Sequence, residues 1–576
     1  MSNWRETYQS WLDSPSLSEA EWAELNAIRD NDKEIEDRFF APLAFGTAGL
    51  RGVMGLGTNR MNIHIIRHAT QAFAEVVAQC GEEAMQRGVV VCRDCRLNGE
   101  DFAREAACVM AANGIHVRLF ESLRPTPELS FAIRYYKAQA GINVTASHNP
   151  KEYNGYKVYW DDGAQLPPRE AAEIAAIMEK SDVFTAPKRM AYEEALEKGL
   201  IELIGEETDA AYLEQVCAQA INKDTVAKVA DELKIVFTPF HGCGWKLVPE
   251  ALKRLGIKHL YPVKEQMVLD GAFPTVKSPN PENPEGFYLA VDLAKEVGSN
   301  LIIGTDPDSD RVGVLVRRGE EYVPITGNQM GVLLLDYVYT ARKALGTLPE
   351  HPVALTTIVS SAMVRAVCEK NGIHFEETFT GFKFMAEKLA EYAENGNYYE
   401  YILAFEESYG YMMGDFVRDK DAVTASMMIA EMAAYWHAQG KTLLDAMEAL
   451  YEKYGHYAEK TVNLFMYGVD GLREMQALMA SLRANPPAEI AGTGVKRVRA
   501  YQSGDIVIPG LGVVEKTPIA GSNVLYFELS DGSNLVVRPS GTEPKIKIYV
   551  LARGESAADC RAKRDRYAEY AQNMAN

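Results

Sequence analysis

The chain alternates short apolar runs, rich in β-branched residues, with longer segments of helical periodicity. This alternation predicts α/β domains in which helices connect the parallel strands of a sheet. An acidic, tryptophan-containing helical segment up to about residue 40 precedes the first run. The runs that predict strands are 88–94, 141–147, 234–240, 301–308, 353–361 and 401–408.

Three of these runs end abruptly in polar loops that carry reactive side chains. The loops read TASHNP at 145–150, DPDSDR at 306–311 and EESYG at 406–410. In open α/β sheets, ligands bind beyond the carboxyl ends of the strands, where loop amides and helix amino termini converge. The pattern therefore predicts three α/β units that face one cleft.

The last part of the chain has a different pattern. Segments 525–541 and 545–552 predict antiparallel strands with a turn at Asp531-Gly532, and a helix is predicted from about residue 555. This pattern indicates a separate α+β domain. The predicted division is therefore three α/β domains at 1–208, 209–322 and 323–455, followed by an α+β domain at 456–576.

Length and composition limit the possible classes of protein. The 576 residues exceed what one hydrophobic core supports, and 47% apolar and 24% charged residues are typical of a globular protein. With 80 acidic against 60 basic side chains, the formal net charge is −20. Such a surface repels nucleic acid and anionic membranes, so neither is expected as a partner. An anionic substrate would need a locally basic pocket.

The amino terminus and the cysteines indicate a cytoplasmic protein. No basic segment followed by an apolar stretch opens the chain, and no apolar run is long enough to span a bilayer. The eight cysteines are scattered, which fits a reducing compartment. Cys92 and Cys95 form a C-x-x-C pattern, but no second pair completes a zinc site, and a redox role is not favoured. The sequence predicts no particular oligomeric state.

Asp306, Asp308 and Asp310 occupy alternate positions at a predicted strand end. Such carboxylates can turn toward one hard cation, and ligand sets made only of oxygen favour Mg²⁺ or Ca²⁺ over zinc. An EF-hand is excluded because Arg311 and Arg317 stand where that loop needs glycine and glutamate. The alternative is a solvated acidic turn, although three crowded carboxylates repel one another unless a cation neutralises them.

Ser147 lies at the tip of a predicted turn that Pro150 helps to end. It has three interpretations: a hydrolase nucleophile with His148 as its base, an ordinary turn residue, or a phosphoryl carrier. The hydrolase is less favoured because sequence neighbours rarely meet in triad geometry and no G-x-S-x-G is present. A phosphoserine needs a cation to offset its charge, and the aspartate loop would supply one.

Further polar residues are candidates for the same site. Lys157 in NGYK could pass a proton to or from a reacting hydroxyl, and a surface lysine is the alternative. Arg51, on the glycine-rich segment FGTAGLRG, is predicted to lie on a flexible loop that can approach a phosphate. Glu406, Glu407 and Ser408 offer oxygen atoms suited to sugar hydroxyls, although an acidic helix start explains this run equally well.

The segment RPSGTEPK at 538–545 combines a guanidinium, two hydroxyls, a glycine amide and a lysine within eight residues. A tight strand connection would explain its proline and glycine, but not its arginine and hydroxyls, so a phosphate-binding loop is favoured. The chain lacks G-x-x-x-x-G-K-[ST], which argues against a nucleotide-driven kinase.

Taken in order, TASHNP, NGYK, GTDPDSDR, EESYG and RPSGTEPK extend over nearly the whole chain. With these motifs the sequence resembles the α-D-phosphohexomutase family, and within it the long bacterial phosphoglucomutase and phosphomannomutase branch related to phosphopentomutase. The resemblance implies four domains around a central cleft, three of one α/β topology and a carboxyl-terminal domain that closes over it. Many relatives have Gly-Glu-x-Ser-Gly-His in the sugar loop, whereas here Phe405 precedes Glu406 and Tyr409 precedes Gly410.

The resemblance also implies roles for individual residues. Ser147 would carry the phosphoryl group, and a phosphoserine oxygen with the three aspartates would hold one Mg²⁺ per chain. Lys157 and Arg51 would assist proton transfer, with His148 and Arg311 beside the phosphate. The residues that would contact the substrate's sugar and its second phosphate are Gly381, Lys383, Glu406, Ser408, Arg538, Ser540, Gly541 and Thr542.

The resulting prediction is a phosphosugar mutase that interconverts glucose 1-phosphate and glucose 6-phosphate, with the mannose phosphates as a second candidate pair. A sugar 1,6-bisphosphate would be its intermediate and activator. The alternative within the family is a phosphopentomutase that acts on ribose or deoxyribose phosphates. A second class is a phosphosugar-binding sensor that has lost catalysis. Such a protein would be expected to have lost Ser147, Lys157 or an aspartate, and all are present. A metal-dependent phosphatase would release free phosphate instead.

Overall fold

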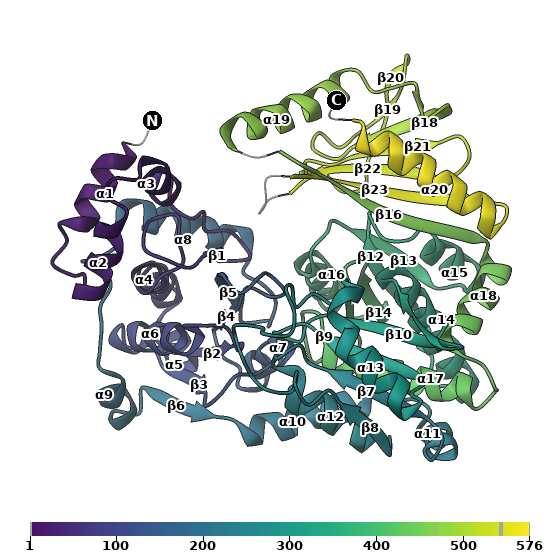
Figure 1. Ribbon diagram of the computed structural model, residues 1–576, viewed down its shortest axis with the longest axis horizontal. Helices are drawn as coiled ribbons and strands as arrows, with labels where there is room; N and C mark the ends of the chain where they lie inside the picture. The colour runs from purple at the N-terminus through teal and green to yellow at the C-terminus, as the bar shows by residue number, and fades with distance from the viewer. Residues whose placement is uncertain (1–2, 467, 541–544, 575–576) are drawn as a thin grey trace. The chain divides into compact units, whose positions relative to one another are not determined.

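The computed structural model describes residues 3–466, 468–540 and 545–574 (Figure 1). Within that part of the chain, the fold divides into two compact units. The first unit comprises residues 1–325 and 409–439, and the second comprises 326–408 and 440–576. The predicted four-domain division stays a prediction, but segment 409–439, which that division assigned to the third domain, lies in the first unit.

The first unit begins with the predicted helical segment, which is confirmed. Its rings pack edge to face: Tyr8 and Trp11 each contact Phe39. These contacts join the segment to the core of the first sheet. The helices are α1 (Trp4–Leu12), α2 (Glu19–Ala27) and α3 (Asp32–Phe39).

The first sheet has the strand order β1-β5-β4-β2-β3-β6. Strands β4, β2, β3 and β6 are parallel, whereas β5 runs antiparallel to both β4 and β1. Residues Val89 and Val91 of β2 pack into one core cluster, and Val90 and Cys92 pack into another. The sheet therefore has an apolar core on both faces, as parallel strands require. The strands are β1 (Leu50–Val53), β2 (Val89–Arg93), β3 (Val117–Phe120), β4 (Ala140–Val144), β5 (Tyr153–Trp160) and β6 (Ile201–Ile204). The helices are α4 (Ile63–Gln79), α5 (Glu82–Arg87), α6 (Gly99–Ala112), α7 (Thr126–Tyr135), α8 (Pro168–Lys180) and α9 (Tyr192–Glu197).

The second sheet has the order β11-β10-β9-β7-β8, with β8 and β9 parallel to β7 and an antiparallel β9-β10-β11 edge. Helix α17 (Ala422–His437) of segment 409–439 packs on α12 and is buried on every side from Ala422 to Ala434. Such an all-round apolar helix belongs in a protein core. The strands of this sheet are β7 (Lys234–Thr238), β8 (His259–Pro262), β9 (Leu301–Thr305), β10 (Val312–Arg318) and β11 (Glu321–Ile325). Segment 409–439 also contains the short strand β15 (Gly410–Met412), which is not part of this sheet. The remaining helices are α10 (Glu206–Ala218), α11 (Lys223–Val229), α12 (Gly244–Leu255), the 3₁₀ turn η1 (Pro284–Phe287) and α13 (Tyr288–Val297).

The second unit contains a third parallel sheet, in which β12 pairs with β13 and β14. Helix α14 lies close to β14 at Gly331, where a Cβ atom would come within 2.2 Å of the Phe405 ring. Glycine is therefore required for this packing. The elements are β12 (Pro352–Thr357), β13 (His374–Thr378), β14 (Glu400–Glu406), α14 (Gly327–Leu345), α15 (Met363–Asn371), α16 (Phe382–Glu394) and α18 (Leu443–Tyr454).

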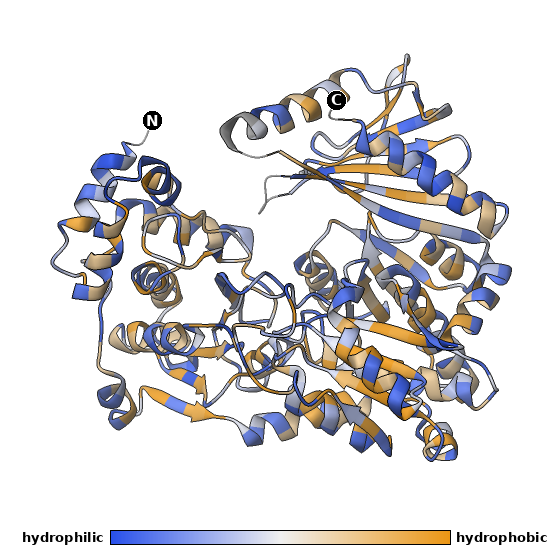
Figure 2. Ribbon diagram, viewed as in Figure 1, coloured by the Kyte–Doolittle hydropathy of each residue, from blue (hydrophilic) through white to orange (hydrophobic). Residues whose placement is uncertain are grey.

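An antiparallel sheet completes the second unit, with α20 packed on β16 and β23 (Figure 1). The predicted turn at Asp531-Gly532 joins β21 and β22, with Gly532 at φ +83°. Figure 2 shows these strands with apolar stretches and the helices striped with polar residues. The elements are β16 (His456–Phe465), β17 (Glu489–Ile490), β18 (Thr493–Ala500), β19 (Asp505–Ile508), β20 (Gly512–Lys516), β21 (Leu525–Leu529), β22 (Asn534–Pro539), β23 (Lys545–Gly554), α19 (Gly468–Ala484) and α20 (Ala557–Gln572).

The predicted fold class, mixed α/β sheets followed by an α+β part, is confirmed. The predicted strand ends are wrong by several residues: run 141–147 ends as β4 at Val144, and run 301–308 ends as β9 at Thr305. The chain turns shortly after each of these ends, where Ser147 and Ser309 have φ of +54° and +53°, outside the strand region. Among the described residues, no helix combines the length and apolar character needed to cross a bilayer.

Candidate active site

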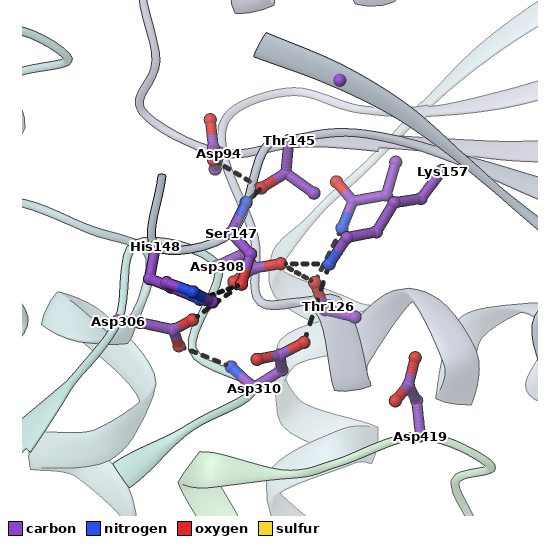
Figure 3. A network of polar contacts seen from close by, with 12 residues as sticks. Asp94, Thr126, Thr145, Ser147, His148, Lys157, Asp306, Asp308, Asp310 and Asp419 are labelled. Carbon is purple, nitrogen blue, oxygen red and sulfur yellow. Dashed lines mark hydrogen bonds and ion pairs between the residues drawn. The ribbon is translucent and has the colours of Figure 1, made fainter. Parts of the chain in front are cut away.

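The serine loop after β4 and the aspartate loop after β9 meet in the first unit. The Ser147 hydroxyl donates a hydrogen bond to Asp306 Oδ2 at 3.1 Å, although 159 residues separate the two in the chain. Figure 3 shows the serine, His148 and the three aspartates grouped around this contact. The structure thus brings together the predicted phosphoryl carrier and the predicted cation ligands.

Local hydrogen bonds fix the position of Ser147. Its backbone N–H donates to Thr145 Oγ1 at 2.9 Å, and the Thr145 hydroxyl donates to Asp94 Oδ2 at 2.6 Å. The left-handed conformation of Ser147 turns the chain sharply at the end of β4. The hydroxyl is therefore placed by a defined turn, even though Ser147 itself is only 3% exposed.

His148 lies beside the serine, although sequence neighbours rarely meet in triad geometry. Its Nδ1 is 3.1 Å from Ser147 Oγ. Burial lowers the pKa of His148 well below its ordinary range, and the nearby Arg311 and Arg51 lower it further. A neutral imidazole is the form that these surroundings favour, so His148 lies beside the serine oxygen without adding a positive charge.

The three aspartates form a compact, buried cluster whose ligand oxygens lie within 4.8 Å of one another. Burial raises the pKa of Asp306 well above its ordinary value, and the charges of Asp308 and Asp310 raise it further. Burial alone would also raise the pKa of Asp310, but Lys420 and Lys157 lower it instead. The cluster therefore carries strong electrostatic repulsion, which nearby cations only partly offset.

The cluster fits a hard divalent cation. Asp308 Oδ1 and Asp310 Oδ1 are buried and accept no hydrogen bond within the part of the chain that is described. Unsatisfied carboxylate oxygens in a protein interior cost free energy unless a cation or a donor meets them. Because the ligand atoms offered are all oxygens, the donor set suits Mg²⁺ better than a soft metal.

Lys157 lies in β5 and points into the cluster (Figure 3). Its Nζ donates to Asp308 Oδ2 at 2.7 Å and is 3.6 Å from Asp310 Oδ2. Burial favours the neutral amine, but these two carboxylates outweigh it and raise the pKa of Lys157. The surface-lysine alternative is wrong, because only 6% of the residue is exposed. The Thr126 hydroxyl donates to the same Asp308 oxygen at 2.8 Å.

A second lysine, which the sequence pattern did not single out, lies in this cluster. Lys420 Nζ is 3.3 Å from Asp310 Oδ2 and 2.9 Å from Asp419 Oδ1. Asp419 in turn accepts a hydrogen bond from the Tyr159 hydroxyl at 2.9 Å. The available signal was the run Arg418-Asp419-Lys420-Asp421 directly before the apolar helix α17, where all four charged residues are buried.

The predicted arginines also lie in the first unit. Arg51 is in strand β1, not on a flexible loop, and its Nη1 donates to Asn149 Oδ1 at 3.3 Å. The glycines before it form a closed turn, and Gly49, at φ +74°, leaves no room for a Cβ against the Tyr156 carbonyl oxygen. Arg311 Nη1 donates to Glu282 Oε1 at 3.1 Å, and its Nε is 3.7 Å from Asp310 Oδ1.

In the second unit, Glu406 and Gly381 come together: the Gly381 N–H donates to Glu406 Oε1 at 2.6 Å. Lys383 lies in the first turn of α16, where burial lowers its pKa. Glu407, from the same predicted sugar-binding run, accepts a hydrogen bond from the Thr357 hydroxyl at 3.1 Å. Burial raises the pKa of Glu407 to about 7, and Glu406 contributes to the shift.

The predicted phosphate loop begins at the end of β22. Arg538 and Glu407 both lie close enough to Tyr549 to act on its hydroxyl: burial raises the pKa of Tyr549, Glu407 adds to this, and Arg538 opposes it. The Ser540 N–H donates to the Lys545 carbonyl at 2.9 Å. Gly541 and Thr542 lie outside the described residues. Within the second unit, the end of β14 and Arg538 are thus neighbours.

The thiols of the C-x-x-C pattern are held in their protonated form. Cys92 is buried in the sheet core, and burial raises the pKa values of the Cys92 and Cys95 thiols well above the ordinary range. A thiol that resists deprotonation is a poor nucleophile and a poor metal ligand. All eight cysteines of the chain are free.

Comparisons with known proteins cover most of the chain. The models of phosphoglucomutase/phosphomannomutase α/β/α domains I, II and III match residues 42–184, 210–319 and 326–454. A phosphoglucomutase of Staphylococcus aureus strain N315 is 34% identical over 531 residues, which are 91% of this chain and 92% of that protein. The phosphoglucomutase of strain MSSA476 is 33% identical over 544 residues, 93% and 94% of the two chains.

Solved structures share the fold. The phosphoglucomutase pp63/parafusin from Paramecium has a TM-score of 0.66 at 19% identity, covering 92% of this chain and 96% of that one. A phosphoglucomutase/phosphomannomutase family protein from Burkholderia thailandensis has a TM-score of 0.64 at 20% identity, covering 92% and 97%. With three consecutive domain models and full-length relatives in agreement, the chain belongs to the α-D-phosphohexomutase family of phosphoglucomutases and phosphomannomutases.

Proposed function

We propose that the chain is a phosphosugar mutase in which Ser147 carries the phosphoryl group. The observation that supports this most strongly is the hydrogen bond of 3.1 Å from Ser147 Oγ to Asp306, beside two more buried aspartates. A nucleophilic hydroxyl and a cation-binding cluster at one point are what phosphoryl transfer needs, because its catalysis is mainly alignment and charge neutralisation.

The first half of the reaction transfers the phosphoryl group from phosphorylated Ser147 to the sugar. A free hydroxyl oxygen of the sugar monophosphate attacks the phosphorus, its P–O bond forms, and the bond from phosphorus to Ser147 Oγ breaks. The hydroxyl proton is relayed to the departing Ser147 oxygen, and Lys157, Arg51 and His148 are the candidates for this relay. The product is a sugar bisphosphate.

The second half reverses these steps at the other phosphate. After the bisphosphate turns around, Ser147 Oγ attacks the other phosphorus, and the sugar oxygen leaves with a proton. Arg311 lies beside this centre and suits the charge of the phosphoryl group. Gly381, Lys383, Glu406 and Ser408 would contact the sugar, and Arg538, Ser540, Gly541 and Thr542 would hold the phosphate that is not transferred.

Asp306, Asp308 and Asp310 would hold one Mg²⁺ together with an oxygen of phosphorylated Ser147. When bound, the ion would neutralise charge that develops on the phosphoryl oxygens. The protein's own contribution is to keep the three carboxylates close together despite their repulsion, with Lys157 and Lys420 offsetting part of it.

We propose glucose 1-phosphate and glucose 6-phosphate as the substrate pair, since the full-length relatives above are named phosphoglucomutases. The mannose phosphates remain a second candidate pair. The phosphopentomutase alternative is not favoured by these relatives. We further propose a cytoplasmic location and a sugar 1,6-bisphosphate activator.

A coupled assay of glucose 6-phosphate formation tests the proposal, run beside ribose 1-phosphate and mannose 1-phosphate with added Mg²⁺. We expect turnover of glucose 1-phosphate, with an initial lag that glucose 1,6-bisphosphate removes. Intact-protein mass spectrometry should then find one phosphoryl group, and fragmentation of its peptides should locate that group at Ser147. Stoichiometric release of free phosphate would instead identify a phosphatase, and negligible glucose turnover would overturn the substrate assignment.

A further inference from the structure

A buried ion pair lies beneath the serine loop. Asp94 and Arg96 directly follow β2, the parallel neighbour of β4. Their side chains are 0% exposed, and Arg96 Nε is 3.3 Å from Asp94 Oδ2. A fully buried pair whose charges point away from solvent needs a structural or functional reason, because desolvation offsets much of its attraction.

The Nη1 and Nη2 groups of Arg96 both donate hydrogen bonds to backbone carbonyl oxygens of the serine loop. Nη2 donates to the carbonyl oxygens of Ser147 at 2.7 Å and Asn149 at 2.5 Å. Nη1 donates to the carbonyl oxygens of Pro150 and Tyr153, both at 2.9 Å. One planar guanidinium therefore fixes four carbonyls across seven residues, from Ser147 to the first residue of β5.

Asp94 acts on the other side of the same serine. Its Oδ2 accepts the Thr145 hydroxyl proton at 2.6 Å, and Thr145 Oγ1 accepts the Ser147 N–H at 2.9 Å. The Oδ1 atom of Asp94 accepts a hydrogen bond from the backbone N–H of Arg96 at 2.8 Å. The ion pair thus controls both the N–H and the carbonyl of Ser147, whose φ of +54° is unfavourable for a residue with a side chain.

We propose that the Asp94–Arg96 pair is the positioning device that holds Ser147 in its left-handed turn, so that Oγ reaches the aspartate cluster. This inference rests on the proposed function, in which Ser147 is the phosphoryl carrier. Arg96 is not a phosphate-binding cation, since its four terminal N–H groups are all given to loop carbonyls and its side chain is inaccessible. It acts through the serine and does not touch the substrate.

The mildest test removes the hydrogen bonds through which the Thr145 hydroxyl connects Asp94 to Ser147. Thr145→Val keeps the side-chain shape but removes the bridge from Asp94 to the Ser147 N–H, and Thr145→Ser restores it. We expect Thr145→Val to lower kcat by about tenfold or more with KM changed less than twofold, and Thr145→Ser to recover most of kcat. A residue needed only for stability would not divide kcat from KM in this way.

The stronger test replaces the guanidinium of Arg96, which binds the four loop carbonyls. Arg96→Lys keeps the charge but can donate to fewer carbonyls in a less fixed geometry, and we expect kcat to fall by about a hundredfold. The matched control is Arg124→Lys, which alters another buried arginine that pairs with an aspartate and donates to a carbonyl away from the serine loop. It should lose stability but keep kcat within about threefold of the parent, a difference of less than 0.7 kcal/mol in activation free energy.

Hydrogen exchange supplies a readout that does not depend on activity. In Arg96→Lys, peptides covering 145–153 should exchange at least about tenfold faster than in Arg124→Lys, measured at equal global stability. Equal exchange, or kcat losses no larger than that of Arg124→Lys, would overturn the positioning role. If the parent protein itself transfers no phosphoryl group, the proposed function fails, whereas the exchange result still decides whether the pair fixes the loop.

Discussion

Strands β4 and β9 occupy the same position in two sheets of the first unit, yet the loops that follow them carry opposite chemistry. Each strand lies between one parallel and one antiparallel neighbour, β2 and β5 for β4, and β7 and β10 for β9. Each loop turns through a left-handed serine, Ser147 or Ser309. One loop presents a nucleophile, and the other presents three carboxylates.

The two loops are held in different ways. The serine loop is held chiefly by one ion pair from a neighbouring strand end, with a further hydrogen bond from Arg51 to Asn149. The aspartate loop is held by many small contributions: Asp306 Oδ1 accepts the N–H groups of Asp310 and Arg311, while Thr126 and Ala422 supply further amides. We infer that the serine loop is sensitive to single changes at its support, whereas the aspartate loop is sensitive mainly at its ligands.

The largest effect should come from removing the hydroxyl of Ser147, because the left-handed Ser309 has no corresponding role as a carrier. Ser147→Ala removes the carrier oxygen, and we expect kcat to fall by at least about ten-thousandfold while glucose 1-phosphate still binds. Coupled turnover and calorimetric binding measure the two quantities. The matched change is Ser309→Ala, at the equivalent turn, which should cost less than about tenfold. Similar losses in both variants would show that the serines share a structural role.

A smaller effect is expected from the charge of the aspartate loop. Asp308→Asn removes one carboxylate charge and weakens one ligand, so Mg²⁺ should bind about tenfold to a hundredfold more weakly and kcat should fall by about a thousandfold. Titration with Mg²⁺ followed by activity at saturating Mg²⁺ separates the two losses. An unchanged Mg²⁺ requirement would place the cation elsewhere.

The antiparallel neighbour of β4 supplies the next test. Lys157→Met should lower kcat by about a hundredfold, because the variant can neither exchange a proton nor offset Asp308. Lys157→Arg keeps the positive charge but holds its proton too firmly for transfer. If Lys157→Arg retains nearly full activity, charge compensation is the role of this lysine, and the proton must move through another group.

Much of this comparison follows from the sequence because buried parallel strands and the polar loops after them have clear patterns. Strands β4 and β9 are buried at every position, and the strand-end rule correctly brought Ser147 to Asp306. The strand ends were wrong because a left-handed serine leaves no signature in an apolar run. Hydrogen bonds from a side chain to distant carbonyls are equally invisible, which is why Arg96 was missed.

Buried charge was the other source of error. A run such as Arg418-Asp419-Lys420-Asp421 normally predicts a solvated surface, since charged residues are rarely buried unless paired. Here each partner comes from a distant segment: Lys420 meets Asp310, and Asp419 meets Tyr159. Pairing of this kind depends on the tertiary fold, so local pattern could not predict it.

The smallest expected effect extends the comparison to β14, whose loop carries Glu406 and Glu407. Because burial raises the pKa of Glu407 to about 7 from an ordinary 4.5, the folded protein prefers the protonated form. The resulting loss of stability is absent below pH about 4.5, grows as the pH rises, and is complete above pH about 7, where it amounts to about 3 kcal/mol. Glu407→Gln should therefore raise the melting temperature by about 5 °C at pH 8 and leave it unchanged at pH 4.5.

Glu400→Gln, at the exposed start of the same strand, is the matched control and should show no such pH dependence. If Glu407→Gln changes the melting temperature equally at both pH values, the carboxyl charge of Glu407 does not limit stability. The loop after β14 would then accommodate its buried carboxylates, as the aspartate loop does.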